Sequence, residues 1–200
     1  MREADLIDVV LTNPINSAIL QRLPQVGLAD AWLVSGSLFQ TVWNNKTGRP
    51  FDHGIKDYDI FYFDDSDLSW TAEDRAIRAG AEVFADLGSE IEIRNQARVH
   101  LWYPEKFGSP YPPLTCSTDG IDRFLAIACM VGVRSDASGG FDVYAPHGLM
   151  DLERMIIRPN ITPGFQAERY RAKSARWLQF WPELEVIEPS KENRAHHCFE

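Results

Sequence analysis

Two aspartates lie inside the most strand-like stretch of the sequence. Asp57 and Asp59 are two residues apart within GIKDYDIFYFDD (54–65), among aromatic and aliphatic residues. Because side chains alternate across a strand, both carboxylates point to the same face. Neighbouring carboxylates repel each other and are costly to bury unless a positive charge lies between them. The pattern therefore predicts a hard divalent cation, Mg²⁺ or Mn²⁺, bound by oxygen ligands.

A third acid is expected on a neighbouring strand. The segment EIEIRN (90–95) alternates acids and isoleucines with a period of two, which predicts a strand with one polar face. Glu92, between Ile91 and Ile93, is predicted to complete the metal shell. Glu90 lies on the same face and remains an alternative for this role.

The segment VSGSLFQ (34–40) has the pattern of a phosphate-binding turn. A short apolar run, typical of a buried strand, ends at Gly36, which lets the backbone turn tightly. Ser37 is expected to open a helix and to form a capping box with Gln40. A helix N-terminus has free N–H groups that attract phosphate. Gly36 and Ser37 are therefore candidates for binding the phosphates of a nucleotide.

Three metal-binding acids beside a phosphate-binding turn describe a site for phosphoryl or nucleotidyl transfer by two metal ions. These residues resemble the signature of the DNA polymerase β-like nucleotidyltransferase superfamily. Most of the chain is similar to bacterial nucleotidyltransferase family proteins, through GSLFQTVWN, GIKDYDIFYFD, RNQARVHLWY and IDRF. The resemblance implies that Gly36 and Ser37 hold the triphosphate. It also implies that Asp57 and Asp59 bind both metals and that the third acid, Glu92, helps to activate the acceptor hydroxyl.

Other patterns have a structural interpretation as well as a functional one. An acidic strand face also occurs as a solvated edge that discourages aggregation. Arg169, Lys173 and Arg176 share one helix face, which is predicted to be solvated, with a clamp for triphosphate or acceptor as the alternative. Four aromatic residues are predicted to fill the core: Trp32, Trp43, Phe61 and Phe63.

The element pattern predicts an α/β (α+β) fold, a small mixed β-sheet backed by helices. Helices are expected on both sides of Pro14, over about 70–87, from Thr118 or Asp119 to Cys129, over 148–157 and over about 163–181, and residues 44–54 read as a loop. A hairpin is expected across the Ser-Gly-Gly turn at 138–140. The Pro-rich segment 109–118 suggests a boundary between a catalytic core, 1–114, and a helical and hairpin region, 115–200, that completes the cleft.

Composition narrows the possible classes of protein. A chain of 200 residues, 44% of them hydrophobic, can form one domain with a proper core. A net charge of −9 and a pI near 5.0 argue against a general nucleic-acid binder. The spacing of Cys116, Cys129 and Cys198 suits neither a zinc site nor a disulfide framework. The acidic start is unlike a signal peptide and no apolar run reaches membrane length, so we expect a cytoplasmic protein without a membrane partner.

The leading hypothesis is an enzyme that transfers a nucleoside monophosphate from an NTP to an acceptor hydroxyl and releases pyrophosphate. The acceptor is expected to be a small molecule or a protein rather than nucleic acid, docked between the Asp57/Asp59 strand and the region after Pro113. The alternative is a catalytically inactive nucleotide-binding or partner-binding module of the same fold. The three acids favour the enzyme, because an idle site has no physical reason to keep mutually repelling carboxylates.

Overall fold

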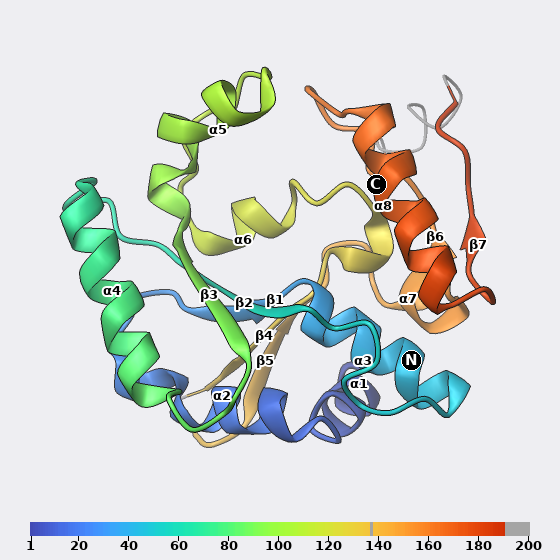
Figure 1. Ribbon diagram of the computed structural model, residues 1–200, viewed down its shortest axis with the longest axis horizontal. Coiled ribbons are helices and arrows are strands. Elements are labelled where there is room, and N and C mark those ends of the chain that lie inside the picture. Colours follow the sequence, from blue (N-terminus) through green and yellow to red (C-terminus); the bar gives the residue numbers. More distant parts are fainter. Residues whose placement is uncertain (137, 191–200) are drawn as a thin grey trace.

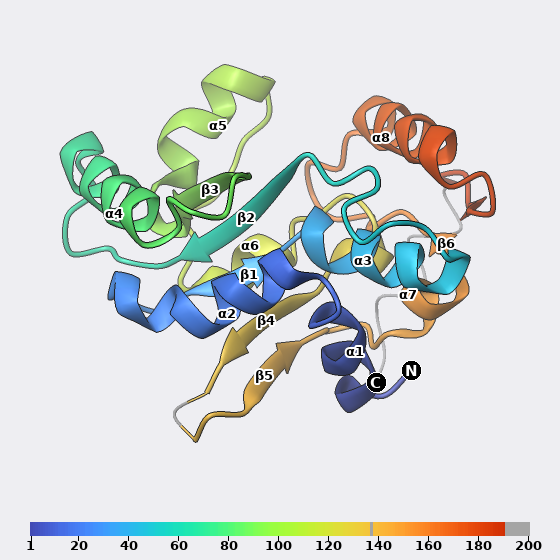
Figure 2. The ribbon, with the colours of Figure 1, turned by 60° about the horizontal axis from the view of Figure 1, so that its bottom comes forward.

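A five-stranded mixed sheet forms the centre of the protein (Figures 1 and 2). The computed structural model describes residues 1–136 and 138–190. The strands of the sheet are β1 (Trp32–Val34), β2 (Asp57–Tyr62), β3 (Glu90–Asn95), β4 (Gly132–Ser135) and β5 (Phe141–Tyr144). Their order is β3-β2-β1-β4-β5, in which only the β2–β3 pair is parallel. The predicted α/β class with a small mixed sheet is therefore confirmed.

Helices lie on both faces of this sheet. They are α1 (Glu3–Val10), α2 (Pro14–Val26), α3 (Gly36–Thr47), α4 (Trp70–Val83), α5 (Val99–Phe107), α6 (Ser117–Ile121), α7 (Met150–Arg154) and α8 (Ala167–Phe180). Two 3₁₀ turns, η1 (Gln96–Arg98) and η2 (Ile127–Cys129), and a two-stranded sheet of β6 (Ile156–Ile157) and β7 (Glu185–Val186) complete the described elements. Figures 1 and 2 show α2 and α6 on opposite sides of the central sheet.

Strand β2 divides the protein into a core side and a site side. Its residues alternate between buried and partly exposed, with Tyr58, Ile60 and Tyr62 in the core. On the same side, Gly80 of α4 packs directly against Ile93 of β3. The apolar alternation in the sequence thus orients the strand, and the acids of β2 are left on the opposite side.

The region after residue 114 contributes to the same sheet as the region before it. Strand β4 pairs with β1 through Leu33 and Val133, and the predicted hairpin of β4 and β5 is confirmed. The helix boundary at Pro14 is also confirmed, because Pro14 is the first residue of α2. The predicted loop over 44–54 is too long, since α3 continues to Thr47 and ends at Gly48 in the left-handed conformation.

The helix predicted from Thr118 or Asp119 to Cys129 is too long. Helix α6 ends at Ile121, and only the short turn η2 follows. The backbone between them is bonded to a distant segment instead: Asn160 donates its side-chain amide to the carbonyls of Asp122 and Phe124, and Ile127 donates its N–H to the carbonyl of Arg158. These tertiary hydrogen bonds replace the helical ones, which local periodicity could not reveal.

The described cysteines form no disulfide. Cys116 and Cys129 are free thiols, whereas Cys198 lies outside the described residues. Among the helices of residues 1–136 and 138–190, none has the length and apolar character needed to cross a bilayer.

Candidate active site

The parallel pairing of β2 and β3 brings four acids to one face of the sheet. Asp57 lies beside Glu90, and Asp59 lies beside Glu92. Asp59 and Glu92 both line a cavity of about 370 Å³, which we call the main cavity. Glu90 is exposed at the start of β3. Of the two candidate third acids, Glu92 therefore shares the cavity wall with Asp59.

Three of the four acids have basic partners. The Lys56 ammonium lies 3.0 Å from Asp57 Oδ2 and 3.9 Å from Glu90 Oε2. Arg94 Nη2 lies 3.3 Å from Glu92 Oε2 on the same strand. These cations offset the like-charge repulsion that the sequence pattern predicts.

Asp59 is in a different environment. The pKa of its carboxyl is raised to about 6, chiefly by burial and also by the charges of Asp57 and Glu92, although the hydrogen bond from Ser35 and the charge of Lys173 lower it. The ionised form of Asp59 is therefore disfavoured in this site. A cation that binds there would favour the ionised carboxylate and so lower this pKa.

The donor set fits a hard divalent cation, because carboxylate oxygens are its preferred ligands. Within the described residues, however, no three His, Cys, Asp or Glu side chains stand close enough together to form a ready metal centre. Lys56 and Arg94 hold Asp57 and Glu92 in their present positions. Binding of Mg²⁺ through all three acids would compete with these ion pairs.

The turn between β1 and α3 lies next to the acids. Helix α3 begins at Gly36, and Ser35 before it has φ 66° and ψ −141°, a conformation that residues with a Cβ rarely adopt. Ser35 and Gly36 line an adjoining cavity of about 260 Å³, which we call the side cavity, together with Asp57 and Asp59. Asp59 thus lines both cavities.

The capping box predicted at Ser37 and Gln40 is wrong. Ser37 is fully buried, and its hydroxyl lies 3.5 Å from the carbonyl of Val34. Ser35 occupies the cap position, and its carbonyl accepts from the N–H groups of Leu38 and Phe39. Helix geometry leaves the N–H groups of Gly36 and Ser37 without an intrahelical acceptor. Gly36 lines the side cavity, whereas Ser37 lines neither cavity.

A buried polar network fixes the start of α3. The Ser37 carbonyl accepts from Asn16 Nδ2 at 3.0 Å and from Thr41 Oγ1 at 2.6 Å. Asn13 Nδ2 donates to Thr41 Oγ1 at 3.2 Å and to the Tyr58 hydroxyl at 3.3 Å. The helix that faces the acids is therefore tied to the segment between α1 and α2 and to strand β2.

Helix α8 covers α3 and brings basic residues to the site. Trp177 is buried against Phe39 and Trp43, with ring centroids 5.4 Å and 6.0 Å apart. One helical turn away, Lys173 lines both cavities, and Arg176 lines the side cavity. Both side chains are exposed, as predicted for a solvated face, but this face opens on the acids.

Aromatic residues complete the main cavity. Trp32 and Trp43 are buried as predicted, whereas Phe61 lines the cavity with its ring 5.7 Å from that of Phe124. Helix α5, which the sequence analysis missed, adds Tyr103 and Phe107. Their spacing of four residues is a helical signal, but Pro104 between them argues against a helix.

Comparisons with known proteins agree with this geometry. A family model described as Nucleotidyltransferase matches residues 21–186. The chain belongs to this nucleotidyltransferase family. The chain is also similar to a protein whose NMR structure is described as revealing a CCA-adding enzyme head domain, with a TM-score of 0.75 and 25% identity over 94% of this chain and 97% of the other. No curated protein matches the chain. The polymerase β-like resemblance and the assignment as an enzyme are confirmed.

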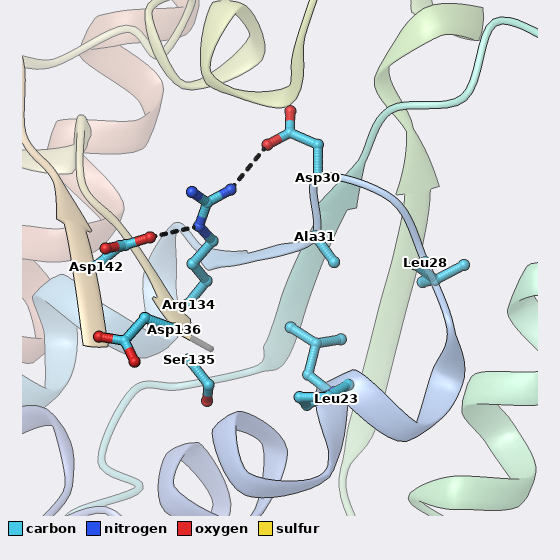
Figure 3. Close-up of a pocket in the computed structure, with 9 residues that line it drawn as sticks. Leu23, Leu28, Asp30, Ala31, Arg134, Ser135, Asp136 and Asp142 are labelled. Carbon is cyan, nitrogen blue, oxygen red and sulfur yellow. Dashed lines mark hydrogen bonds and ion pairs between the residues drawn. The ribbon is translucent and has the colours of Figure 1, made fainter. Parts of the chain in front are cut away.

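A further cavity of the nucleotidyltransferase, about 470 Å³, lies away from these acids between α2 and β4 (Figure 3). Arg134 in this cavity is paired with Asp30 at 3.2 Å and with Asp142 at 2.9 Å, as the dashed lines in Figure 3 show. Its guanidinium also stacks on Trp32, 4.3 Å from the ring centroid. Arg134 is thus paired with acids within the cavity, and its contacts with Trp32 and Asp142 join β1, β4 and β5. Among the described residues, this cavity therefore offers no free cation to an anionic substrate.

Proposed function

We propose that this nucleotidyltransferase transfers a nucleoside monophosphate from an NTP to an acceptor hydroxyl, with Mg²⁺ or Mn²⁺ as cofactor. The observation that carries the proposal is the position of Asp59. It lies between the side cavity, with the N-terminus of α3, and the main cavity, with Glu92. A phosphate-binding helix end and a candidate proton acceptor therefore meet at one carboxylate.

Each residue has a distinct part in the proposed reaction. The backbone N–H groups of Gly36 and Ser37 bind the β- and γ-phosphates, and Lys173 opposite them offsets their charge. Asp57, Asp59 and Glu92 hold the divalent cation, which when bound polarises the phosphate and neutralises charge on the leaving group.

Glu92 takes the proton of the acceptor hydroxyl. The hydroxyl oxygen forms a bond to the α-phosphorus while the bond to the bridging oxygen breaks, and the electron pair leaves with pyrophosphate. Glu92 is suited to this step because it lines the main cavity beside Asp59. The acceptor is proposed to be a small molecule or a protein, bound between β2 and the region after Pro113.

One observation favours a second function, an inactive nucleotide-binding module. Lys56 and Arg94 already neutralise Asp57 and Glu92 without a metal. A protein that binds nucleotide but has lost turnover could keep its acids in this way. The two functions differ in whether pyrophosphate is released.

The test is incubation with each of the four NTPs, Mg²⁺ or Mn²⁺, and pools of candidate acceptors, with pyrophosphate as the readout. We expect release with at least one NTP, and at least a hundredfold loss in Asp59→Asn. Asp65→Asn is the matched control, because it removes the same charge from an exposed position after β2. Nucleotide-dependent thermal stabilisation without pyrophosphate would identify the inactive module. If neither stabilisation nor pyrophosphate release is seen at millimolar NTP and metal, both functions are refuted.

A further inference from the structure

The side of the main cavity formed by α5 combines aromatic rings with basic residues. In both views of the ribbon, α5 and α8 stand on opposite sides of α6 (Figures 1 and 2). Six residues from these helices and from the segments flanking α6 line this side, and we call them the cradle: Tyr103, Lys106, Phe107, Tyr111, Arg123 and Arg169.

The rings of the cradle are packed together but are not core residues. The Tyr103 ring lies 4.6 Å from that of Phe107 and 4.4 Å from that of Tyr111, measured between centroids. All three remain partly exposed. Arg169 stacks 3.9 Å over Phe107 and donates to the Tyr103 hydroxyl at 2.8 Å. The rings therefore form a fixed platform that is open to the cavity.

The cations of the cradle have no acidic partners. Within residues 1–136 and 138–190, neither Lys106 nor Arg123 nor Arg169 forms an ion pair with a carboxylate. The chain carries 29 acidic and 20 basic residues, so this local excess of positive charge opposes the overall balance. Cations that gather at a cavity without acidic partners attract an anionic ligand.

The cradle lies on the acceptor side of the site. Glu92, the proposed base for the acceptor hydroxyl, lines the same main cavity. The helix end at Gly36 and the side chain of Arg176 line the side cavity, where the triphosphate is proposed to bind. A molecule held by the cradle can therefore approach Glu92 without displacing the phosphates.

We propose that the cradle binds the acceptor, and that the acceptor is a nucleotide-like molecule: a planar ring that carries an anionic group. The inference rests on the proposed function and narrows its acceptor. An aromatic ring stacks on Tyr103 or Tyr111, which is favourable for any base. A phosphate or carboxylate pairs with Arg123 or Arg169. Polycationic acceptors are disfavoured by repulsion from the same side chains.

Binding can be tested separately from turnover. Asp59→Asn protein without metal is titrated by calorimetry with adenosine monophosphate, a short adenosine trinucleotide and spermidine. We expect saturable binding of both nucleotides and none of spermidine. Equal affinity for adenosine monophosphate and the trinucleotide would indicate that the acceptor is a free small molecule. Tighter binding of the trinucleotide would indicate that it is the end of a strand. Both outcomes support binding of the acceptor at the cradle.

Variants in the same background locate the ligand. Tyr103→Ala and Arg169→Gln should each weaken nucleotide binding at least tenfold, and Tyr103→Phe, which keeps the ring, should weaken it less. Arg78→Gln is the control, because Arg78 is exposed on α4 and paired with Asp74. Affinity unchanged in the cradle variants, or full competition between adenosine monophosphate and an NTP, would overturn the inference. Absence of pyrophosphate release by the unmodified protein would instead refute the proposed function, so the two failures are distinguishable.

Discussion

Asp59 links the charge of the site to the stability of the fold. The pKa of its carboxyl is raised to about 6 from its ordinary value of 3.8, chiefly by burial. A raised carboxyl pKa means that the folded state binds the proton more tightly than the unfolded state. The ionised group therefore lowers stability, and this cost appears as pH rises from about 4 to about 6 and persists above it.

Asp59→Asn should consequently stabilise the metal-free protein at pH 7.5 and change little at pH 4. A shift of this size corresponds to at most about 3 kcal/mol, because one pKa unit is about 1.4 kcal/mol. Urea unfolding at the two pH values measures the gain. The control Asp65→Asn removes one negative charge at an exposed position. An equal gain in both variants would show that overall charge, and not the environment of Asp59, is responsible.

The sequence predicted the acids better than their partners. Alternation along β2 and β3 was enough to place Asp57, Asp59 and Glu92 on one face. The ion pairs of Lys56 and Arg94 depend on side-chain conformations that no residue pattern specifies. The residue pattern therefore predicted the shared face of the acids but not their ion pairs.

Two buried rings, Tyr170 and Trp177, anchor helix α8 and its basic residues. Trp177 is 4% exposed, and its indole N–H has no hydrogen-bond partner among the described residues, so its contribution is packing alone. Trp177→Ala should lower the free energy of unfolding by about 3–5 kcal/mol. It should also weaken NTP binding, because Lys173 lies one turn away. Leu178→Ala, at a position that is 37% exposed, should cost less than about 1 kcal/mol in the same denaturant titration.

Helix α4 approaches β3 so closely that a methyl group matters. A Cβ added at Gly80 would collide with Cδ1 of Ile93, while Cγ1 would be at 3.4 Å. Gly80→Ala should thus be destabilising by about 1–3 kcal/mol despite the better helix propensity of alanine. In Ile93→Val, which lacks Cδ1, the same change should be neutral or stabilising. A double-mutant cycle by urea unfolding tests the coupling, and additive effects would refute the close contact.

Elements with their own periodicity were predictable, and elements defined by distant partners were not. The strand over 90–95 was predicted with its observed bounds from alternation alone. The helix predicted to continue to Cys129 ends at Ile121, because Asn160 binds the carbonyls that follow. The cavity wall formed by α5 was missed because a proline interrupts its pattern. The basic face of α8 was recognised, but only the fold shows that it opens on the acids.

The charge of the whole protein is distributed unevenly. The net charge is −9, yet Lys106, Arg123, Arg169 and Lys173 all line the main cavity. A long polyanion would be attracted by these cations only at the cavity and would be repelled by the acidic surface elsewhere. A small anionic acceptor inside the cavity would contact the cations without this repulsion. The distribution therefore favours ligands that fit inside the cavity.

Long nucleic acid should accordingly bind weakly and with a shallow dependence on salt. Single strands release about 0.7 counterions per phosphate contacted, so four cations give a slope of log K against log salt no steeper than about −3. We expect a fifty-nucleotide RNA to bind no more tightly than the trinucleotide in a fluorescence anisotropy titration at several salt concentrations. Lys173→Glu should weaken NTP binding more than RNA binding. A steeper slope, together with NTP-dependent labelling of the RNA end that Lys173→Glu abolishes, would show instead that α8 clamps RNA and that the acceptor is a nucleic-acid strand.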